Sequence, residues 1–362
     1  MHRGDDAARE RGPTMADVSA TTESPMTITA LVPAFGGKRN LAGEIAAELG
    51  DHRTRWVLCA GSLALELSLP PCSMETSVDL HGDLTNLARV IKSPALCAHL
   101  YRLLRRTLMH ETLFAESDQI IRQGERDGTA ARLADGQGTD AERMWRAYHY
   151  FVVSWMGRNG TALTPASHKG TFCVSYTNKG GHAGKRWAGS VDSLPAWSRR
   201  LRSITVLRRC IFGVAERISD EPGSVLYCDP PYLVKGCTYL HDDNAGRPES
   251  VSDDEWSAAV LWARANRNSD MTAERLAWHK CLAARLRRFR VARVVVSYYA
   301  HPLLADLYPG WTLRRLTATK AMAHAGQRGA TGRIDAPEVL LINGPSFAEP
   351  LSPATLFDGG KP

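Results

Sequence analysis

The sequence lacks the patterns that mark several common classes of protein. Its eight cysteines lie scattered among apolar neighbours and form no C-x-x-C pair, which argues against a zinc site or a disulfide framework. No run approaches about 18 consecutive apolar residues, so we expect no membrane span. The first residues contain no apolar segment of the signal-peptide type. These absences predict a cytoplasmic protein with reduced thiols.

The sequence has fewer acidic than basic residues. Lys and Arg number 45 against 38 Asp and Glu, which gives a formal net charge of +7. Such an excess suits a polyanionic partner, although a merely basic surface would explain it equally well. The scattered histidines show no metal-ligand spacing, so we expect no bound metal; they include His168, His182 and His279.

Apolar runs of strand length alternate with amphipathic segments along most of the chain. This alternation predicts an α/β fold with a mostly parallel sheet. The first 27 residues are polar and poor in aromatics, and we expect them to be a disordered tail. We expect strands in RWVLCAG, METSVDL, SITVLRR, GSVLYCD, VARVVVSYY, TLRRLTATK and EVLLIN.

Helices are expected between these strands. In NLAGEIAAELG, Asn40 is the expected N-cap and Gly50 the stop. Residues 94–157 have a helical, Arg-rich pattern, interrupted by a loop at DGTAARLADGQGT. The composition of 157–190 predicts loops and a poor core, and the polar segment 240–270 predicts an insertion loop.

The segment SVLYCDPPY joins a buried strand to a rigid loop. Ligands in open α/β sheets bind beyond the carboxyl ends of strands, which is where Asp229 would lie. Pro230 and Pro231 lack N–H groups and fix their φ angles, and Tyr232 offers a flat ring. Acceptors beside an aromatic ring suit an exocyclic amine on a planar base. On spacing alone, a Pro-rich strand end with a capping aspartate is an equally open interpretation.

This tetrapeptide resembles the catalytic motif of amino-group DNA methyltransferases. AFGGKRNLAGEI, VLCAGSLALEL and ETSVDLHGDLTNLARVI resemble the glycine-lysine motif, the glycine turn and the acidic second-strand motif of the Dam-type adenine-N6 DNA methyltransferase family. VVVSYYAHPLLADLYPGW and APEVLLIN follow in that family's order. The resemblance covers roughly 31–110 and 195–343. It implies a Rossmann-like S-adenosylmethionine-dependent methyltransferase fold with S-adenosylmethionine as methyl donor.

The resemblance also implies roles for single residues. The Asp229 carboxylate and the Pro230 carbonyl would accept the two N6 hydrogens of a flipped-out adenine, and Tyr232 would stack on its ring, with Pro231 stiffening the loop. The implied cofactor-binding residues are Phe35, Gly37, Lys38, Cys59, Gly61, Ser62, Asp79 and Cys210.

Four of these positions have an implied role of their own. Gly61 would let the backbone approach the cofactor, and Ser62 would open the following helix. Asp79 would bind ribose hydroxyls, with a helix-capping role as the alternative. Lys38 is matched to a lysine near the cofactor and the active site, and the alternative is a surface lysine.

The chain departs from the family's pattern at several positions. Ala34 stands where an aromatic residue is usual, with Phe35 beside it, Cys59 replaces another aromatic residue, and Cys210 stands near a usual acid. These departures predict weaker cofactor binding and leave the catalytic tetrapeptide intact. Cys228 is expected to be buried packing, because the amine itself attacks the methyl group.

The unmatched middle of the chain is the predicted target-recognition region. Basic residues there can neutralise phosphates, although each alone also fits a solvated charge. The candidates for binding DNA are Arg158, Lys169, Lys179, Lys185 and Arg186, together with the loop 320–333. We predict a catalytic domain over 28–95 and 195–348, a helical and loop-rich recognition region over 96–194, and tails over 1–27 and 349–362.

The sequence therefore predicts a site-specific adenine-N6 methyltransferase that acts on double-stranded DNA. Methylation of cytosine N4 or of an RNA adenine remains open, because both offer the same exocyclic amine. A catalytically inactive DNA-binding relative is the alternative from another class. A paired restriction endonuclease is left open as a partner.

Overall fold

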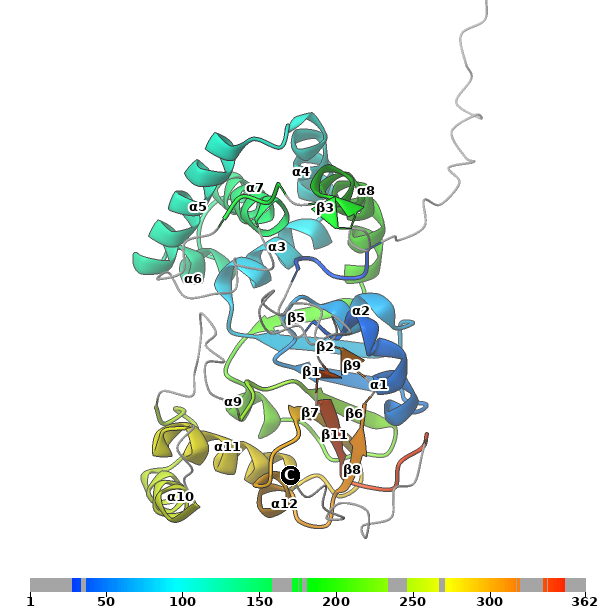
Figure 1. Ribbon diagram of the computed structural model, residues 1–362, viewed down its shortest axis with the longest axis vertical. Coiled ribbons are helices and arrows are strands. Elements are labelled where there is room, and N and C mark those ends of the chain that lie inside the picture. The colour runs from blue at the N-terminus through cyan, green and yellow to red at the C-terminus, as the bar shows by residue number, and fades with distance from the viewer. Residues whose placement is uncertain are drawn as a thin grey trace, which may run out of the picture.

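A seven-stranded sheet forms the centre of the computed structural model (Figure 1). Its strands, in sheet order, are β5 (Ile204–Arg208), β2 (Met74–Asp79), β1 (Thr54–Leu58), β6 (Ser224–Cys228), β7 (Arg293–Tyr299), β11 (Glu338–Ile342) and β8 (Thr312–Arg315). All neighbouring pairs are parallel except those that β11 forms with β7 and β8. The predicted α/β fold with a mostly parallel sheet is thus confirmed.

The structure describes most of the chain. The described residues are 28–33, 37–157, 171–174, 176–177, 181–233, 246–266, 271–316, 318–319, 335–336 and 338–348. Two further strand pairs are short: β3 (Tyr176–Thr177) with β4 (Gly181–His182), and β9 (Ala318–Thr319) with β10 (Asp335–Ala336).

Both faces of the sheet are covered, so a central strand can be buried along its whole length. All five residues of β6 are buried. Because successive side chains of a strand point to opposite faces, Leu226 and Cys228 enter one core cluster, and Val225 and Tyr227 enter another. The loop that follows β6 therefore starts from a strand held on two sides.

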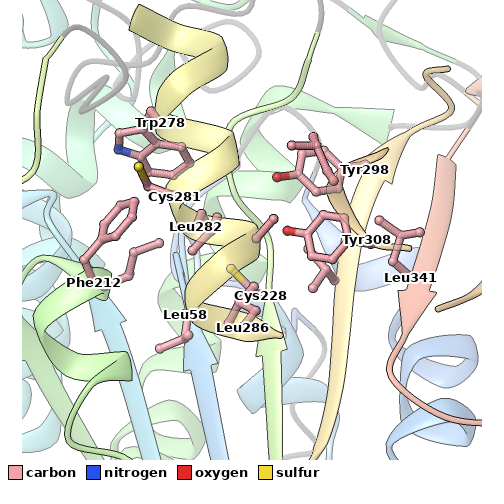
Figure 2. Packing of buried hydrophobic residues seen from close by; sticks show 14 of the residues in the cluster. Leu58, Phe212, Cys228, Trp278, Cys281, Leu282, Leu286, Tyr298, Tyr308 and Leu341 are labelled. Atoms are coloured by element: carbon pink, nitrogen blue, oxygen red, sulfur yellow. The ribbon is translucent and has the colours of Figure 1, made fainter. Parts of the chain in front are cut away.

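One face carries α9 (Ile211–Ala215), α10 (Asp253–Asn266), α11 (Ala273–Leu286) and α12 (Leu304–Leu307). Figure 2 shows α11 lying over the sheet, with Trp278 near Phe212 and with Leu286 near Cys228 and Leu58. The expected insertion loop over 240–270 is wrong for α10. That helix buries only the small residues Ala259 and Ala263, so its sequence shows little apolar periodicity.

The other face carries α1 (Ala42–Leu49) and α2 (Ala64–Ser68). Gly50 ends α1 with a φ of 64°, as predicted. The prediction of Asn40 as N-cap is wrong, because Leu41 precedes the helix and no side chain caps it. Asn40 instead lies in the 3₁₀ turn η1 (Lys38–Asn40), whose first carbonyl accepts the Leu41 N–H.

A bundle of helices gathers beyond the β5 and β2 end of the sheet (Figure 1). It comprises α3 (Gly82–Lys92), α4 (Pro94–Arg106), α5 (Glu111–Arg126), α6 (Thr129–Ala134), α7 (Asp140–Met156) and α8 (Ala183–Leu201). Phe151, Trp155 and Trp197 pack together at its core. The helical pattern predicted for 94–157 is confirmed. None of the described helices has the length and apolarity that crossing a membrane requires.

Two parts of this bundle differ from the sequence prediction. The expected loop at DGTAARLADGQGT contains α6, which buries Leu133 and Ala134 and is preceded by the left-handed Gly128. The predicted poor core over 157–190 is wrong from Ala183 onward, because α8 starts there and buries Trp187. Helix α8 also crosses the predicted boundary between residues 194 and 195.

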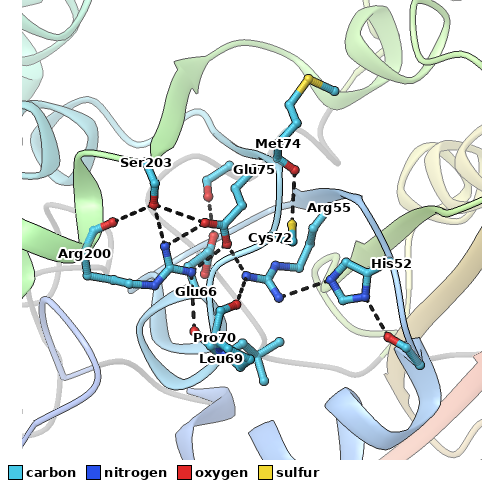
Figure 3. Close-up of polar contacts among 12 residues, drawn as sticks. His52, Arg55, Glu66, Leu69, Pro70, Cys72, Met74, Glu75, Arg200 and Ser203 are labelled. Atoms are coloured by element: carbon cyan, nitrogen blue, oxygen red, sulfur yellow. Dashed lines mark hydrogen bonds and ion pairs between the residues drawn. The ribbon is translucent and has the colours of Figure 1, made fainter.

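A buried polar network joins the end of α8 to the sheet (Figure 3). Arg55 of β1 and Glu75 of β2 are partners in the parallel register and form an ion pair. Arg200 of α8 binds the same carboxylate with Nη–O distances of 2.6 and 2.7 Å. Nearby, the Ser77 hydroxyl donates to Glu66 Oε1 at 2.5 Å. Ion pairs and hydrogen bonds thus join the end of α8 to β1 and β2.

Glu66 gives the fold a pH dependence that can be measured. Burial raises the pKa of Glu66 from 4.5 to about 7, although Ser77 and the two arginines oppose the shift. The folded state therefore binds a proton more tightly than the unfolded chain between pH 4.5 and about 7. Stability contributed by this group falls as the pH rises through that window.

Replacing Glu66 by glutamine should remove this part of the pH dependence. The measurement is urea unfolding of wild type and Glu66→Gln across the window, with the exposed Glu249→Gln as control. We expect the free energy of unfolding to fall less steeply with pH in Glu66→Gln than in the other two proteins. Equal slopes in all three would contradict the burial argument.

Candidate active site

Two loops meet where the strand order of the sheet reverses. The chain passes from β1 to β2 on one side, whereas β6 and β7 lie on the other side of β1. Ligands in open α/β sheets bind outside the carboxyl ends of strands at such a switch point. The loop after β1 starts at Cys59, and the loop after β6 starts at Asp229, whose N–H donates to the Leu58 carbonyl at 3.1 Å.

The loop after β1 is a tight, partly left-handed turn. Cys59, Gly61 and Leu63 have φ angles of 58°, 52° and 57°. A Cβ placed on Gly61 would meet no atom within 4 Å, so the space beside this backbone is open. Ser62 does not open the following helix as expected, because the left-handed Leu63 delays the start of α2 to Ala64.

Asp79, at the end of β2, is held against this turn. Its Oδ2 accepts the Gly61 N–H at 2.7 Å, and its Oδ1 accepts the His81 N–H at 2.8 Å. Helix α3 is capped by His81, whose Nδ1 accepts the Leu84 N–H, so Asp79 is not the N-cap. Each carboxylate oxygen retains a lone pair, since a carboxylate has about four acceptor sites.

Three side chains, from Lys38, Tyr232 and Glu338, meet beside Asp229. The Lys38 ammonium lies 2.9 Å from Asp229 Oδ1 and 2.9 Å from Glu338 Oε1, and it donates to the Tyr232 hydroxyl at 2.6 Å. That hydroxyl donates to Glu338 Oε1 at 2.6 Å. Lys38 is therefore buried within this cluster and is not a surface lysine. Two carboxylates share one ammonium, which leaves the cluster with a negative charge.

Burial and these charges shift the ionisation of the cluster. Burial raises the pKa of Asp229 to about 6, with Lys38 opposing and Glu338 reinforcing the shift. Burial by itself would lower the pKa of Lys38, but Asp229 and Glu338 outweigh it and raise the pKa above its usual value. Burial and both carboxylates raise the pKa of Tyr232 well above 10. Near neutral pH the cluster thus holds a carboxylate at Asp229, an ammonium and a neutral phenol.

The exposure of the aromatic rings in the site differs from what the sequence predicted. Tyr232 is only 3% exposed, and its hydroxyl is bound by Lys38 and Glu338. Its ring is thus covered by the fold and does not offer the free stacking face that was expected. Tyr299, at the end of β7, lies with its ring centroid 4.4 Å from that of Tyr232 and is partly exposed. Tyr299 is the more accessible of the two rings.

Three cysteines lie at the carboxyl ends of strands of the central sheet. Cys228 is fully buried in the core between the sheet and α11, as predicted. A hydrogen bond to Cys228 and burial raise the pKa of Cys59 well above 9, so Cys59 stays a neutral thiol. Cys210 follows β5 and precedes α9 as its N-cap, without a side-chain cap bond.

Other predicted residues make none of the contacts described above, or they lie outside the described residues. Gly37 is exposed and precedes η1. Lys185 is exposed and Arg186 half-buried in the first turn of α8. His182 caps α8, and His279 is buried against Tyr298. Phe35, Arg158, Lys169, Lys179 and the loop 320–333 lie outside the described residues.

Sequence reasoning missed Glu338 and Tyr299. Glu338 opens the buried strand β11, and a single charged residue at the start of the run EVLLI was a usable signal. Its partner Lys38 lies 300 residues earlier in the chain, so no local pattern links the two. Within the described residues, no group of three His, Cys, Asp or Glu side chains is placed to hold a metal ion.

Comparison with known proteins adds no family to this description: no protein-family model and no curated protein matches the chain. The function proposed below therefore depends on the geometry of the site itself.

Proposed function

We propose that the protein is an S-adenosylmethionine-dependent methyltransferase that modifies the N6 amine of adenine in DNA. One observation carries the proposal most strongly. At the switch point of the sheet, the Asp229 carboxylate already accepts a nitrogen donor, the Lys38 ammonium, at 2.9 Å. A carboxylate in this place is suited to binding an exocyclic amine.

The residues after β1 and β2 fit the methyl donor. The open space beside Gly61 allows a ligand to approach the backbone closely, and Asp79 has lone pairs left for ribose hydroxyls. An open, mostly parallel sheet with a switch point is also what a Rossmann-like fold provides. S-adenosylmethionine, when bound there, supplies an electrophilic methyl group to the amine nitrogen.

The chain's own residues orient the amine and stabilise its developing charge. Asp229 and the Pro230 carbonyl accept the two amine hydrogens, which directs the nitrogen lone pair at the methyl group. Positive charge grows on the nitrogen during transfer, and the buried carboxylate of Asp229 stabilises it. The methylated amine loses one proton, for which Asp229 is the adjacent base. Pro230 is buried and Pro231 half-buried, so the acceptors are held in place.

The aromatic residues take separate roles in this proposal. Tyr232 fixes the Lys38 and Glu338 side chains through its hydroxyl. Tyr299 is placed to stack on the flipped base, since it is partly exposed and lies against Tyr232. Extruding a base costs a few kcal/mol, about what stacking on one ring returns. The exposed Lys185 and the half-buried Arg186 remain candidates for phosphate contacts.

The function is tested by incubating the protein with methyl-labelled S-adenosylmethionine and double-stranded DNA, followed by digestion to nucleosides. We expect label in N6-methyldeoxyadenosine. Label in N4-methyldeoxycytidine, or transfer only to RNA, would replace the proposed acceptor with one of the alternatives. Absence of transfer together with tight DNA binding would identify a catalytically inactive relative. Whether a restriction endonuclease accompanies the protein is a separate matter from this chemistry.

A further inference from the structure

The two carboxylates that share Lys38 differ in their exposure. Asp229 has 22% of its side chain exposed, whereas Glu338 has 5%. The ammonium lies 2.9 Å from an oxygen of each. A ligand that enters the site can therefore reach Asp229, while Glu338 forms the closed side of the cluster.

Lys38 occupies the acceptor that the proposed function assigns to the target amine. Asp229 Oδ1 faces the Lys38 ammonium and lies 3.3 Å from the Tyr232 hydroxyl. A target amine that takes this place on Oδ1 has to displace Lys38 from it. A lysine with a single partner would leave a buried charge unpaired on withdrawal, which is strongly unfavourable.

The Tyr232 hydroxyl lies nearer to Glu338 than to Asp229, whereas Lys38 lies equally close to both carboxylates. The Tyr232 hydroxyl lies 2.6 Å from Glu338 Oε1 and 2.6 Å from the Lys38 ammonium, but 3.3 Å from Asp229. Lys38 can thus leave Asp229 and keep its contacts with Glu338 at 2.9 Å and with the Tyr232 hydroxyl at 2.6 Å. The flexible lysine stem allows such a movement without a change in the backbone.

We propose that Glu338 is a positioning residue that retains the Lys38 ammonium when a target amine enters, and so frees Asp229 to accept that amine. This inference rests on the proposed function and extends it to the order of events at the site. Glu338 acts through Lys38 and does not itself contact the substrate.

The charges of Lys38 and Glu338 also set the ionisation of Asp229. Among the described residues, the other titratable groups facing it are Tyr227 of β6, Tyr232 of its own loop and Cys59 after β1, all with pKa values raised by their surroundings. These three are neutral near pH 6, so they do not compete. Removing the charge of Glu338 should lower the pKa of Asp229 from about 6, and removing that of Lys38 should raise it.

The kinetic test is a double-mutant cycle of Glu338→Gln and Lys38→Met, measured as kcat/KM for methyl transfer to DNA. In the wild-type background, Glu338→Gln should lower kcat/KM by about ten-fold or more, because Lys38 then stays on Asp229. In the Lys38→Met background the same change should cost less than about two-fold, since no lysine remains to be moved. Equal losses in both backgrounds would overturn the proposal.

A second measurement does not require activity. The titration of Asp229 in the free protein is followed by ¹³C NMR of carboxyl-labelled aspartate, with the signal assigned by its loss in Asp229→Asn. The midpoint should move down in Glu338→Gln, up in Lys38→Met, and stay in place in the exposed control Glu249→Gln. An unmoved midpoint in Glu338→Gln would overturn the proposal even if Lys38→Met were inactive. Wild-type protein without methyl transfer would instead refute the proposed function.

Discussion

Replacing Asp229 by alanine should lower the rate of methyl transfer by about a thousand-fold or more. The variant loses the acceptor that orients the amine and the carboxylate that stabilises its growing positive charge. Removing a single preorganised group of this kind costs about 10²–10³ in rate, and Asp229 also serves as the adjacent base. The measurement is single-turnover methyl transfer to DNA at saturating S-adenosylmethionine.

The fold should tolerate this change. Asp229 is the more exposed carboxylate of the cluster, and Lys38 retains Glu338 as a one-to-one partner when Asp229 is removed. We therefore expect the DNA affinity and the unfolding midpoint of Asp229→Ala to stay close to those of wild type. The loss then belongs to the chemical step and not to folding.

Two controls sharpen the result. Asp254 is exposed on α10, so Asp254→Ala should transfer methyl groups at the wild-type rate. Asp229→Asn keeps the shape and one acceptor oxygen but lacks the negative charge, and it should fall between alanine and wild type. Turnover near the wild-type rate in Asp229→Ala would rule out the proposed mechanism.

The strands that carry the site could be predicted from the sequence because they have few ways to fold. The run VLYC is apolar and leads into Asp-Pro-Pro, which predicts a buried strand followed by a rigid loop. Gly61 follows a second predicted strand, and Asp79 ends a third. Lys38 was matched to an active-site lysine by resemblance, and the structure places its ammonium on Asp229.

Features that depend on contacts across the fold could not be predicted from local pattern. Helix α10 buries only two alanines. Its apolar face is therefore too narrow to be recognised within a polar segment of the sequence. The burial of Tyr232 depends on Lys38 and Glu338, which come from opposite ends of the chain. The motif predicts which residue types form the site. Whether the Tyr232 ring is buried depends on residues that lie far from it in the sequence.

Replacing Glu75 by leucine should destabilise the fold by about 3–5 kcal/mol, the usual cost of removing one partner from a buried ion pair. Arg55, which is 2% exposed, would keep only the Pro70 carbonyl at 3.0 Å and His52 Nε2 at 3.3 Å (Figure 3). Arg200 would lose both of its carboxylate contacts. Burial alone would raise the pKa of Glu75, but the two arginines outweigh it and lower the pKa, which shows that the carboxylate is ionised and paired.

The companion variant separates an unpaired charge from simple loss of packing. Arg55→Met combined with Glu75→Leu removes both members of the cross-strand pair, so it should be more stable than Glu75→Leu alone. As a control, Asp253→Ala breaks an ion pair to Arg247 in which the aspartate is 89% exposed, and it should cost less than about 1 kcal/mol. Denaturant unfolding gives all three free energies. If the double variant were less stable than Glu75→Leu, the loss would come from missing contacts, and the buried charge of Arg55 would not be its cause.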